Sequence, residues 1–169
     1  MKKTLHATTV LILISIALIA VAVCLRPVNA DDLQPFTTDK CSSWPEGTFS
    51  KPELWTDCCV AHDIAYWQGG TYSERMAADE ALQMCVAEQG EAAISYIMEA
   101  GVFFGGSPFW PTSYRWGYGW PWTRGYGELN DEEKEVAAQL LSEWEALQSS
   151  DNLEADAPGL SEKPQANNP

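Results

Sequence analysis

The hydrophobic pattern predicts three helices in the middle of the chain, over residues 52–68, 72–89 and 91–100. Capping-box pairs stand at the start of the first two, Ser50 with Glu53 and Thr71 with Glu74. Gly69 and Gly70 separate these two helices, and glycine commonly ends a helix. The pattern therefore predicts an all-α fold in which two long helices fold back on each other at a short glycine turn.

Residues 101–127 follow neither a helical nor a strand period. Their aromatic side chains, set among glycines and prolines, are Phe103, Phe104, Phe109, Trp110, Tyr114, Trp116, Tyr118, Trp120, Trp122 and Tyr126. In one interpretation the rings cover the helices as core. In the other, part of them inserts into lipid, with Arg115 and Arg124 near the headgroups. The membrane-interface residues would then be Phe109, Trp110, Trp116, Trp120 and Trp122. We expect both uses, because so many rings exceed what one small core can hide.

A last helix is predicted to begin after Asn130, which is a favourable N-cap residue. Its apolar stripe consists of Val136, Leu140, Leu141, Trp144 and Leu147. From residue 148 the chain is polar and acidic and contains proline, which predicts a disordered tail over residues 148–169.

The first 30 residues have the order of a secretory signal peptide. Lys2 and Lys3 precede an apolar run over residues 9–25, and small residues at 28–30 offer a cleavage site. We expect cleavage near Ala30, a secreted or periplasmic protein and a folded domain over residues 31–147. A retained N-terminal membrane anchor is the alternative, because the run is as long as the shortest membrane-spanning helices.

Removal of residues 1–30 would leave a strongly acidic chain. The full sequence has 10 basic and 24 acidic residues, and the removed part holds Lys2, Lys3 and Arg26, so 7 basic residues remain and the net charge becomes −17. Such a surface repels phosphate backbones, and we expect no nucleic-acid partner. A membrane would have to be contacted through apolar and aromatic side chains or through a bound cation.

The cysteines that follow residue 30 are Cys41, Cys58, Cys59 and Cys85. An even number in an exported chain predicts two disulfides. Cys58 and Cys59 are adjacent on a helix and point in different directions, so each needs its own partner. One alternative is a set of free buried thiols, and another is a zinc site formed by Cys58, Cys59 and His62.

His62 and Asp79 lie at similar distances from the glycine turn. His62 is 7 residues before Gly69. Asp79 is 8 residues after Thr71. At about 1.5 Å per residue, each lies roughly 10–12 Å from the turn. Antiparallel helices would bring the two side chains level, and the rotation of each helix decides whether they face one another. If they do, Asp79 fixes the tautomer of His62 and leaves its other ring nitrogen free as a base.

Residues 58–66 read Cys-Cys-Val-Ala-His-Asp-Ile-Ala-Tyr, and Cys85 follows Asp79 by six residues on the second helix. With the glycine turn, this arrangement resembles the secreted phospholipase A2 superfamily, in a style close to its compact microbial forms. The resemblance covers residues 41–85. It implies two antiparallel disulfide-linked helices, to which this chain adds an aromatic, glycine-rich loop and a C-terminal helix. The implied disulfides are Cys41–Cys59 and Cys58–Cys85.

The resemblance also implies a function, which is hydrolysis of the sn-2 ester of glycerophospholipids at a membrane surface with Ca²⁺ as cofactor. His62 would be the general base, Asp79 would orient it, and Tyr66 would hydrogen-bond to Asp79. Asp63 would bind Ca²⁺, which needs six or more oxygen ligands. Backbone carbonyls would supply others, at Lys40, Ser42 and Trp44.

The segment over residues 41–47 departs from the glycine-rich calcium loop of the animal-type enzymes, because it holds a single glycine, Gly47. A different class of function is therefore the alternative. The same scaffold could serve as a non-catalytic secreted module that binds lipid or protein through its aromatic segment.

Overall fold

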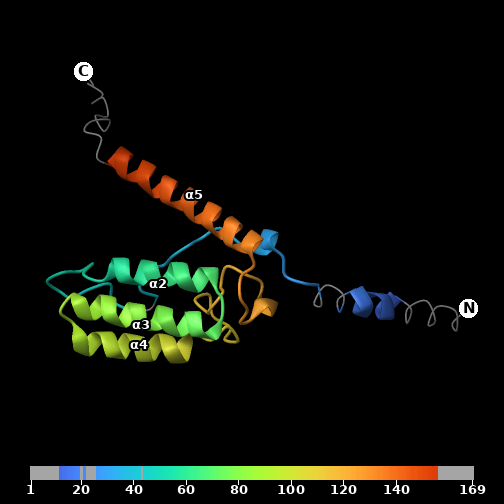
Figure 1. Cartoon of the computed structure of the whole chain (residues 1–169), viewed down its shortest axis with the longest axis horizontal. Coiled ribbons are helices and arrows are strands. Elements are labelled where there is room, and N and C mark those ends of the chain that lie inside the picture. Colours follow the sequence, from blue (N-terminus) through green and yellow to red (C-terminus); the bar gives the residue numbers. More distant parts are fainter. Residues whose placement is uncertain (1–11, 20, 22–25, 43, 156–169) are drawn as a thin grey trace, which may run out of the picture.

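A computed structural model describes residues 12–19, 21, 26–42 and 44–155, and within these residues all regular structure is helical (Figure 1). From residue 30 onward the elements are η1 (Ala30–Asp32), α2 (Thr56–Gln68), α3 (Tyr72–Glu88), α4 (Ala92–Gly105), η2 (Trp122–Arg124) and α5 (Asp131–Ala155), where η denotes a 3₁₀ helix. The prediction of an all-α fold is confirmed.

Helices α2, α3 and α4 lie side by side, with α3 in the middle (Figure 1). Gly69 and Gly70 make the turn between α2 and α3 with φ angles of 70° and 137°, which glycine adopts readily. Thr71 then caps α3, since its Oγ accepts a hydrogen bond from the Glu74 amide while the Glu74 carboxylate accepts one from the Thr71 amide. This capping box was predicted and is confirmed, and the short turn makes α2 and α3 antiparallel.

The predicted start of α2 is wrong, because the helix begins at Thr56 rather than near Pro52 and has no side-chain cap. Trp55 explains the delay. Its indole is buried and donates to the Pro45 carbonyl at 2.6 Å, and its amide donates to the Glu46 carbonyl at 3.1 Å. These long-range bonds hold the preceding residues in turns, so Ser50 and Glu53 do not form the expected capping box.

Helix α4 ends at Gly105 instead of near residue 100. Gly101 lies inside the helix, where a glycine costs only about 1 kcal/mol relative to alanine. Packing against α3 offsets this cost, and Arg75 of α3 binds the carbonyls of Val102 and Phe103 in the last turn. The extra turn brings the end of α4 next to α2.

Two hydrophobic clusters hold the helices together. The first lies among α2, α3 and α4 and has as its buried members Cys41, Trp55, Cys58, Cys59, Leu82, Val86 and Met98. The second joins the glycine-turn end of α2 to α5 through Leu33, Phe36, Trp67, Trp120, Leu129 and Ala137. Trp67, Trp120 and Phe36 therefore connect three segments that are distant in the sequence.

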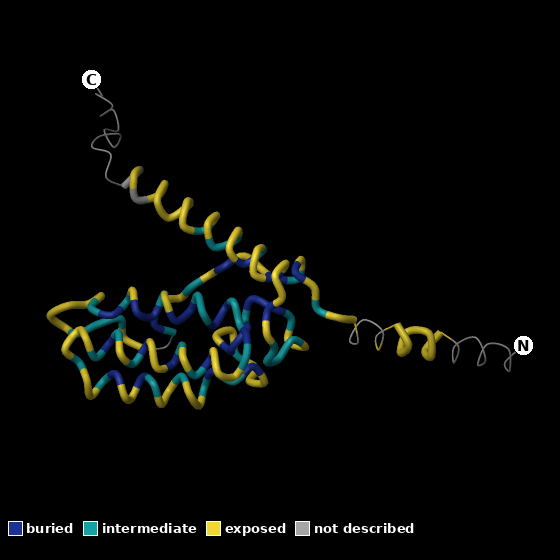
Figure 2. Tube along the Cα trace, in the orientation of Figure 1, coloured by how far each residue is buried: buried dark blue, intermediate teal, exposed yellow. Residues whose placement is uncertain are grey.

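Helix α5 packs against the second cluster with most of its predicted stripe, namely Val136, Leu140, Leu141 and Trp144. Leu147 is an exception, since 64% of its surface is exposed. The Asn130 cap is confirmed, because its Oδ1 accepts from the Glu133 amide at 3.0 Å. The helix continues to Ala155, past the boundary expected at residue 147, and its last turns are exposed (Figure 2). Residues 156–169 of the expected tail lie outside the described residues.

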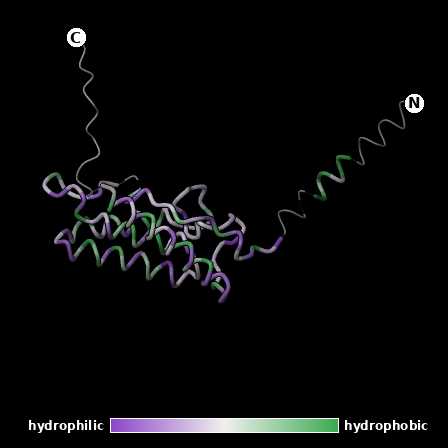
Figure 3. Tube along the Cα trace, turned by 90° about the horizontal axis from the view of Figure 1, so that it is seen from above, coloured by the Kyte–Doolittle hydropathy of each residue, from purple (hydrophilic) through white to green (hydrophobic). Residues whose placement is uncertain are grey.

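Most of the predicted signal segment lies outside the described residues. Residues 12–19 and 21 are helical, exposed and apolar (Figure 3). Within the described ranges, no helix has both the length and the apolar character needed to cross a membrane. Ala30 is buried at the start of η1, which packs against α5. Cleavage near Ala30 stays a prediction.

Two disulfides join the helical core, Cys41 to Cys59 and Cys58 to Cys85. Both predicted pairs are confirmed, and the alternative of free thiols is wrong. The first pair fixes the segment before α2 to that helix, and the second joins α2 to α3. Together with the glycine turn, the second bond sets the register of α2 against α3.

Replacement of both Cys58 and Cys85 by alanine should lower the free energy of unfolding by about 3 kcal/mol, because the bond closes a long loop in the unfolded chain. The sequence separation is 27 residues for this pair and 18 for Cys41–Cys59. Removal of the Cys41–Cys59 bond, which closes the shorter loop, should therefore lower the free energy of unfolding by a few tenths of a kcal/mol less. Urea unfolding followed by circular dichroism measures both losses, and unchanged midpoints would contradict the assigned pairs.

Candidate active site

His62 of α2 and Asp79 of α3 face one another. Nε2 of His62 lies 3.1 Å from Oδ1 of Asp79, and both side chains are buried. The sequence placed the two residues level along their helices without fixing their direction. The structure shows that both point into the α2–α3 interface, and the predicted pair is brought together.

Tyr66 completes this cluster from the next turn of α2. Its hydroxyl donates to Oδ1 of Asp79 at 2.6 Å, as predicted, and its ring lies against the His62 ring with centroids 4.1 Å apart. Burial raises the pKa of Tyr66 well above its ordinary value, with the charge of Asp79 adding to the effect. The phenol therefore stays protonated and acts as a donor to Asp79.

The bonding pattern around Asp79 selects one tautomer of His62. A carboxylate oxygen that already accepts a hydrogen bond from Tyr66 can accept a second hydrogen bond but has no proton to donate. The proton of the neutral imidazole must therefore sit on Nε2, and Nδ1 keeps its lone pair. No protein group in the described ranges is hydrogen-bonded to Nδ1. His62 is thus held by one nitrogen and available as a base through the other.

A cavity of about 270 Å³ opens beside this cluster. Its polar end is formed by His62, Asp63 and Tyr66 of α2 and by the segment before α2. Most of the remaining wall is apolar and comes from α3, α4 and the aromatic loop, through Leu82, Ile97, Met98, Gly101, Val102, Gly105, Gly106 and Tyr114. This cavity can hold a molecule with an apolar chain and place its polar end beside His62.

Asp63 lies between this cavity and a second one of about 190 Å³. The second cavity is lined mainly by oxygen-bearing side chains, from Thr37, Thr38, Asp39, Asp63, Ser113, Tyr114 and Tyr118. Thr38 donates a hydrogen bond to Oδ2 of Asp63 at 2.6 Å and accepts one from the Lys40 amide at 2.9 Å. The Thr38 hydroxyl therefore links the backbone of the segment before α2 to the side chain of Asp63.

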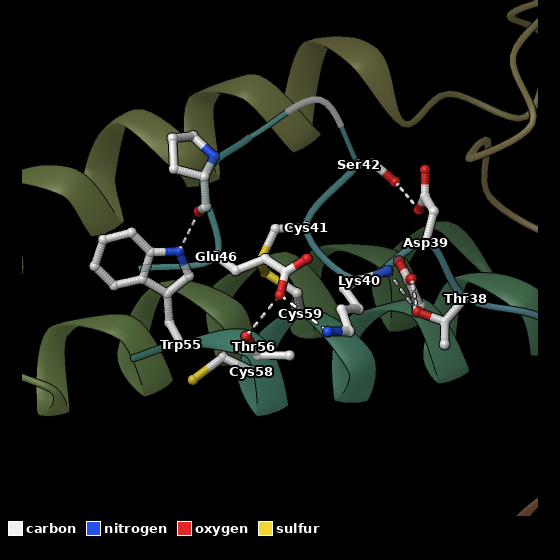
Figure 4. The surroundings of a disulfide bond; sticks show 12 residues. Thr38, Asp39, Lys40, Cys41, Ser42, Glu46, Trp55, Thr56, Cys58 and Cys59 are labelled. Atoms are coloured by element: carbon white, nitrogen blue, oxygen red, sulfur yellow. Dashed lines mark hydrogen bonds and ion pairs between the residues drawn. A yellow bond between two sulfur atoms is a disulfide. The ribbon is translucent and has the colours of Figure 1, made fainter. Parts of the chain in front are cut away.

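Asp63 is buried without a cationic side chain beside it in the part of the chain that the structure describes. Burial raises its pKa from 3.8 to about 7, the hydrogen bond from Thr38 opposes the rise, and the charge of Asp39 adds to it. Lys40 does not relieve this, since its amine pairs with Glu46 at 3.2 Å (Figure 4) and with Glu53 at 3.6 Å. A positive ion beside Asp63 would keep this carboxylate charged.

The residues around Asp63 fit a hard cation in the kind of atoms they offer. Asp63 and Asp39 supply carboxylate oxygens. The three expected carbonyl donors, Lys40, Ser42 and Trp44, line the same cavity as His62 and Asp63. Lys40 has a left-handed backbone with φ of 63°, which turns the chain just before Cys41. No group of three or more His, Cys, Asp or Glu side chains within the described residues is placed to hold a metal, so carbonyl oxygens would have to complete such a site.

The zinc alternative is wrong. The sulfur atoms of Cys58 and Cys59 are each bonded to another cysteine, so neither is a thiolate ligand. His62 uses Nε2 for Asp79 instead. The residues that suggested zinc therefore have structural and hydrogen-bonding roles.

The aromatic segment divides into buried and exposed rings. Trp116 and Trp120, which were expected at a membrane interface, are buried. Their indoles donate to the carbonyls of Gly70 and Gln68 at 2.9 and 2.8 Å. Phe109, Trp110 and Trp122 are exposed, as a surface role requires. The membrane-interface prediction is thus wrong for Trp116 and Trp120, and lipid contact by the exposed rings stays a prediction.

The two arginines of this segment bond within the protein. Arg115 is buried and donates to the carbonyls of Trp116, Gly117 and Trp120. Arg124 pairs with Glu133 at the start of α5. The idea that they reach lipid headgroups is therefore wrong.

The sequence interpretation missed Arg75 and Asp39. Arg75 is buried and contacts both Tyr66 and Asp79, and Asp39 lines the second cavity beside Asp63. For Arg75 a signal existed, since it stands four residues before Asp79 and shares its helix face. For Asp39 the signal was weaker, because a loop carboxylate gives no periodicity.

Comparison with models of protein families, with curated proteins and with solved structures finds no match for this chain. The functional assignment therefore depends on the geometry of the site.

Without added metal, stability should fall as pH rises from about 4 to 7, because the raised pKa of Asp63 means that the folded state holds this proton more tightly than the unfolded chain. Asp63→Asn should remove this fall, which is at most about 4 kcal/mol, since a tenfold change in an acid constant corresponds to about 1.4 kcal/mol. Urea unfolding between pH 4 and 8 with a chelator present measures it.

Asp57→Asn is the matched control, because Asp57 is an exposed acid on the same helix. Its stability should track that of the unmodified chain across the pH range. If the difference in unfolding free energy between the unmodified chain and Asp63→Asn stayed constant across this pH range, the raised pKa of Asp63 would be contradicted.

Proposed function

We propose that this protein is a secreted, calcium-dependent phospholipase A2 that hydrolyses the sn-2 ester of glycerophospholipids. The observation that carries the proposal is the buried cluster of His62, Asp79 and Tyr66 at the polar end of an apolar cavity, with the unpaired carboxylate of Asp63 at the same end. A long-chain ester suits this cavity, because the acyl chain would lie along α4 with its carbonyl near His62.

The protein residues would then act as a general base and its support. Nδ1 of His62 accepts a proton from a water molecule, whose oxygen attacks the ester carbonyl carbon. The bond between that carbon and the glycerol oxygen breaks, and His62 returns the proton to the departing oxygen. The products are a fatty acid and a lysophospholipid. Asp79 and Tyr66 keep the ring in the orientation and tautomer that this transfer needs.

Calcium is the proposed cofactor at Asp63. When bound, the ion supplies positive charge beside the carbonyl oxygen on which negative charge develops. Asp63 and Asp39 would hold it with the carbonyls of Lys40, Ser42 and Trp44. Among the described residues no cationic side chain lies beside Asp63, which supports this assignment, since a buried carboxylate is otherwise costly to ionise.

A phospholipid surface is the proposed partner. Three residues that line the large cavity, Trp44, Ile97 and Tyr114, are also partly exposed apolar side chains. Phe104 and Trp110 lie next to them, since the Trp110 indole donates to the Phe104 carbonyl and Gly105 lies against Tyr114. Because the chain is strongly acidic, we expect contact with zwitterionic rather than anionic lipid.

The arrangement of α2 and α3 also supports the phospholipase A2 proposal. Two antiparallel helices joined by a disulfide, with a second disulfide to the preceding segment, are what the resemblance implied. Disulfides persist in oxidising compartments, which agrees with export across a membrane.

His62→Gln should reduce fatty-acid release from phosphatidylcholine vesicles by about 10²–10⁴-fold, because the amide can bond to Asp79 but is no base. Labelled sn-1 and sn-2 chains identify the ester that is cut. Circular dichroism and thermal unfolding should match the unmodified chain. A folded variant with normal turnover would remove His62 as the base.

Asp63→Asn should lose calcium binding and hydrolysis together, while its helix survives because the backbone bonds are unaffected. For the unmodified chain we expect a Kd on the order of 10⁻⁴–10⁻³ M, the range of extracellular calcium modules. Asp39→Asn should weaken binding less. Titration calorimetry and vesicle hydrolysis on the same preparations measure both effects.

The alternative function is a secreted lipid- or protein-binding module without catalysis. It would be the better assignment if the unmodified chain bound vesicles but showed no calcium binding at millimolar concentration and no chelator-sensitive hydrolysis.

A further inference from the structure

Arg75 is a buried cation that the proposed reaction does not use. It lies on α3, one turn before Asp79, with 3% of its surface exposed. Burial of a guanidinium is costly unless its donors are bonded and its charge is paired. The partners of Arg75 therefore show what this position does for the protein.

On one side, Arg75 contacts the cluster that holds His62. Its Nε donates to the hydroxyl of Tyr66 at 3.2 Å. Its Nη2 lies 3.6 Å from Oδ2 of Asp79, an oxygen that is buried and has no hydrogen-bond partner among the described residues. Oδ1 of the same carboxylate accepts from Tyr66 and faces His62. The guanidinium is thus the cationic group that faces the second oxygen of Asp79.

On the other side, Arg75 holds two segments that form the cavity wall and the aromatic loop. Nη2 donates to the carbonyls of Val102, at 3.0 Å, and Phe103 in the last turn of α4. Nη1 donates to the hydroxyl of Tyr126 at 2.9 Å. The end of α4 also lies close to Tyr66, because a Cβ at Gly106 would lie 2.2 Å from the Tyr66 hydroxyl.

Arg115 offers a comparison within the same chain. It is also buried, but its hydrogen bonds within the described residues go to carbonyls of its own loop, at Trp116, Gly117 and Trp120. Such bonds shape a loop and nothing more. Arg75 differs because its donors reach both Tyr66 and the end of α4, and so connect two parts that must keep a fixed spacing.

We propose that Arg75 is a positioning residue that fixes Tyr66 and Asp79, and through them the ring of His62, against the end of α4 and the aromatic loop. Its meaning for catalysis rests on the proposed function. Its effect on the His62 ring does not, because the ring's tautomer and orientation exist without substrate.

Arg75→Met keeps the length of the side chain and removes its charge and donors. We expect kcat for vesicle hydrolysis to fall on the order of 10²-fold with little change in KM, since misplacing a catalytic group by about 1 Å costs this much. Arg75→Lys keeps the charge but not the planar fork, and should restore part of the loss. Tyr126→Phe removes one outer bond and should have the smallest effect.

The second readout is the tautomer of His62, measured by side-chain ¹⁵N NMR on the full chain without substrate. The signal is assigned by its loss in His62→Gln, which leaves that of His6. The unmodified chain should show the Nε2–H form alone, and Arg75→Met should show a mixture of forms. Glu133→Gln is the control, because it breaks the buried pair with Arg124 and lowers thermal stability without touching this cluster.

The outcomes separate this proposal from the proposed function. If the unmodified chain does not hydrolyse phospholipid, the function fails, and a tautomer change in Arg75→Met still supports the positioning role. Unchanged kcat and an unchanged tautomer in Arg75→Met would overturn the role. It would also be overturned if Glu133→Gln disturbed the His62 ring equally. Should Arg75→Met fail to fold, Arg75→Lys decides by the same two measurements, because it lacks the planar fork, and an unchanged kcat and tautomer in that variant would overturn the role.

Discussion

The register of α2 against α3 is the constraint on which the rest of the structure depends. It is set at one end by the glycine turn and at the other by the disulfide between Cys58 and Cys85. A shift of this register by one residue would move a side chain of one helix about 1.5 Å along the axis and about 100° around it. His62 and Asp79 could not then meet at 3.1 Å. The buried pair follows from constraints that lie outside it.

The two buried aspartates of this site, Asp63 and Asp79, have different surroundings. Asp79 accepts a hydrogen bond from Tyr66, faces His62 and lies near Arg75, so its carboxylate is surrounded by donors. Asp63 has one hydroxyl donor and a second carboxylate nearby, so its pKa is raised. These surroundings agree with the proposal that Asp79 orients a base and Asp63 holds a cation.

The sequence predicts features that depend on neighbours along the chain. The Thr71–Glu74 capping box, the all-α class and the level of His62 with Asp79 arise from local spacing, and both disulfide pairs came from a resemblance. The late start of α2 could not be predicted, because it results from Trp55 bonding to a distant turn. Nor could the sequence tell buried from exposed rings in the aromatic segment, since no period marks the inner face. The spacing of Arg75 and Asp79 was a usable signal, but the bonds of Arg75 to Val102, Phe103 and Tyr126 were not predictable, because these residues lie far along the chain.

The loop between α4 and α5 has a different tolerance to sequence change from the helices around it. A helix keeps its backbone bonds whichever side chain a position carries, so many substitutions leave its path unchanged. Much of this loop is instead held by side chains that bond to distant carbonyls, as Trp116, Trp120 and Tyr118 do. Here the identity of the side chain determines the path of the backbone. Amino-acid substitutions should therefore accumulate slowly at these positions and faster on the outer face of α5, although the loop has less regular structure than the helix.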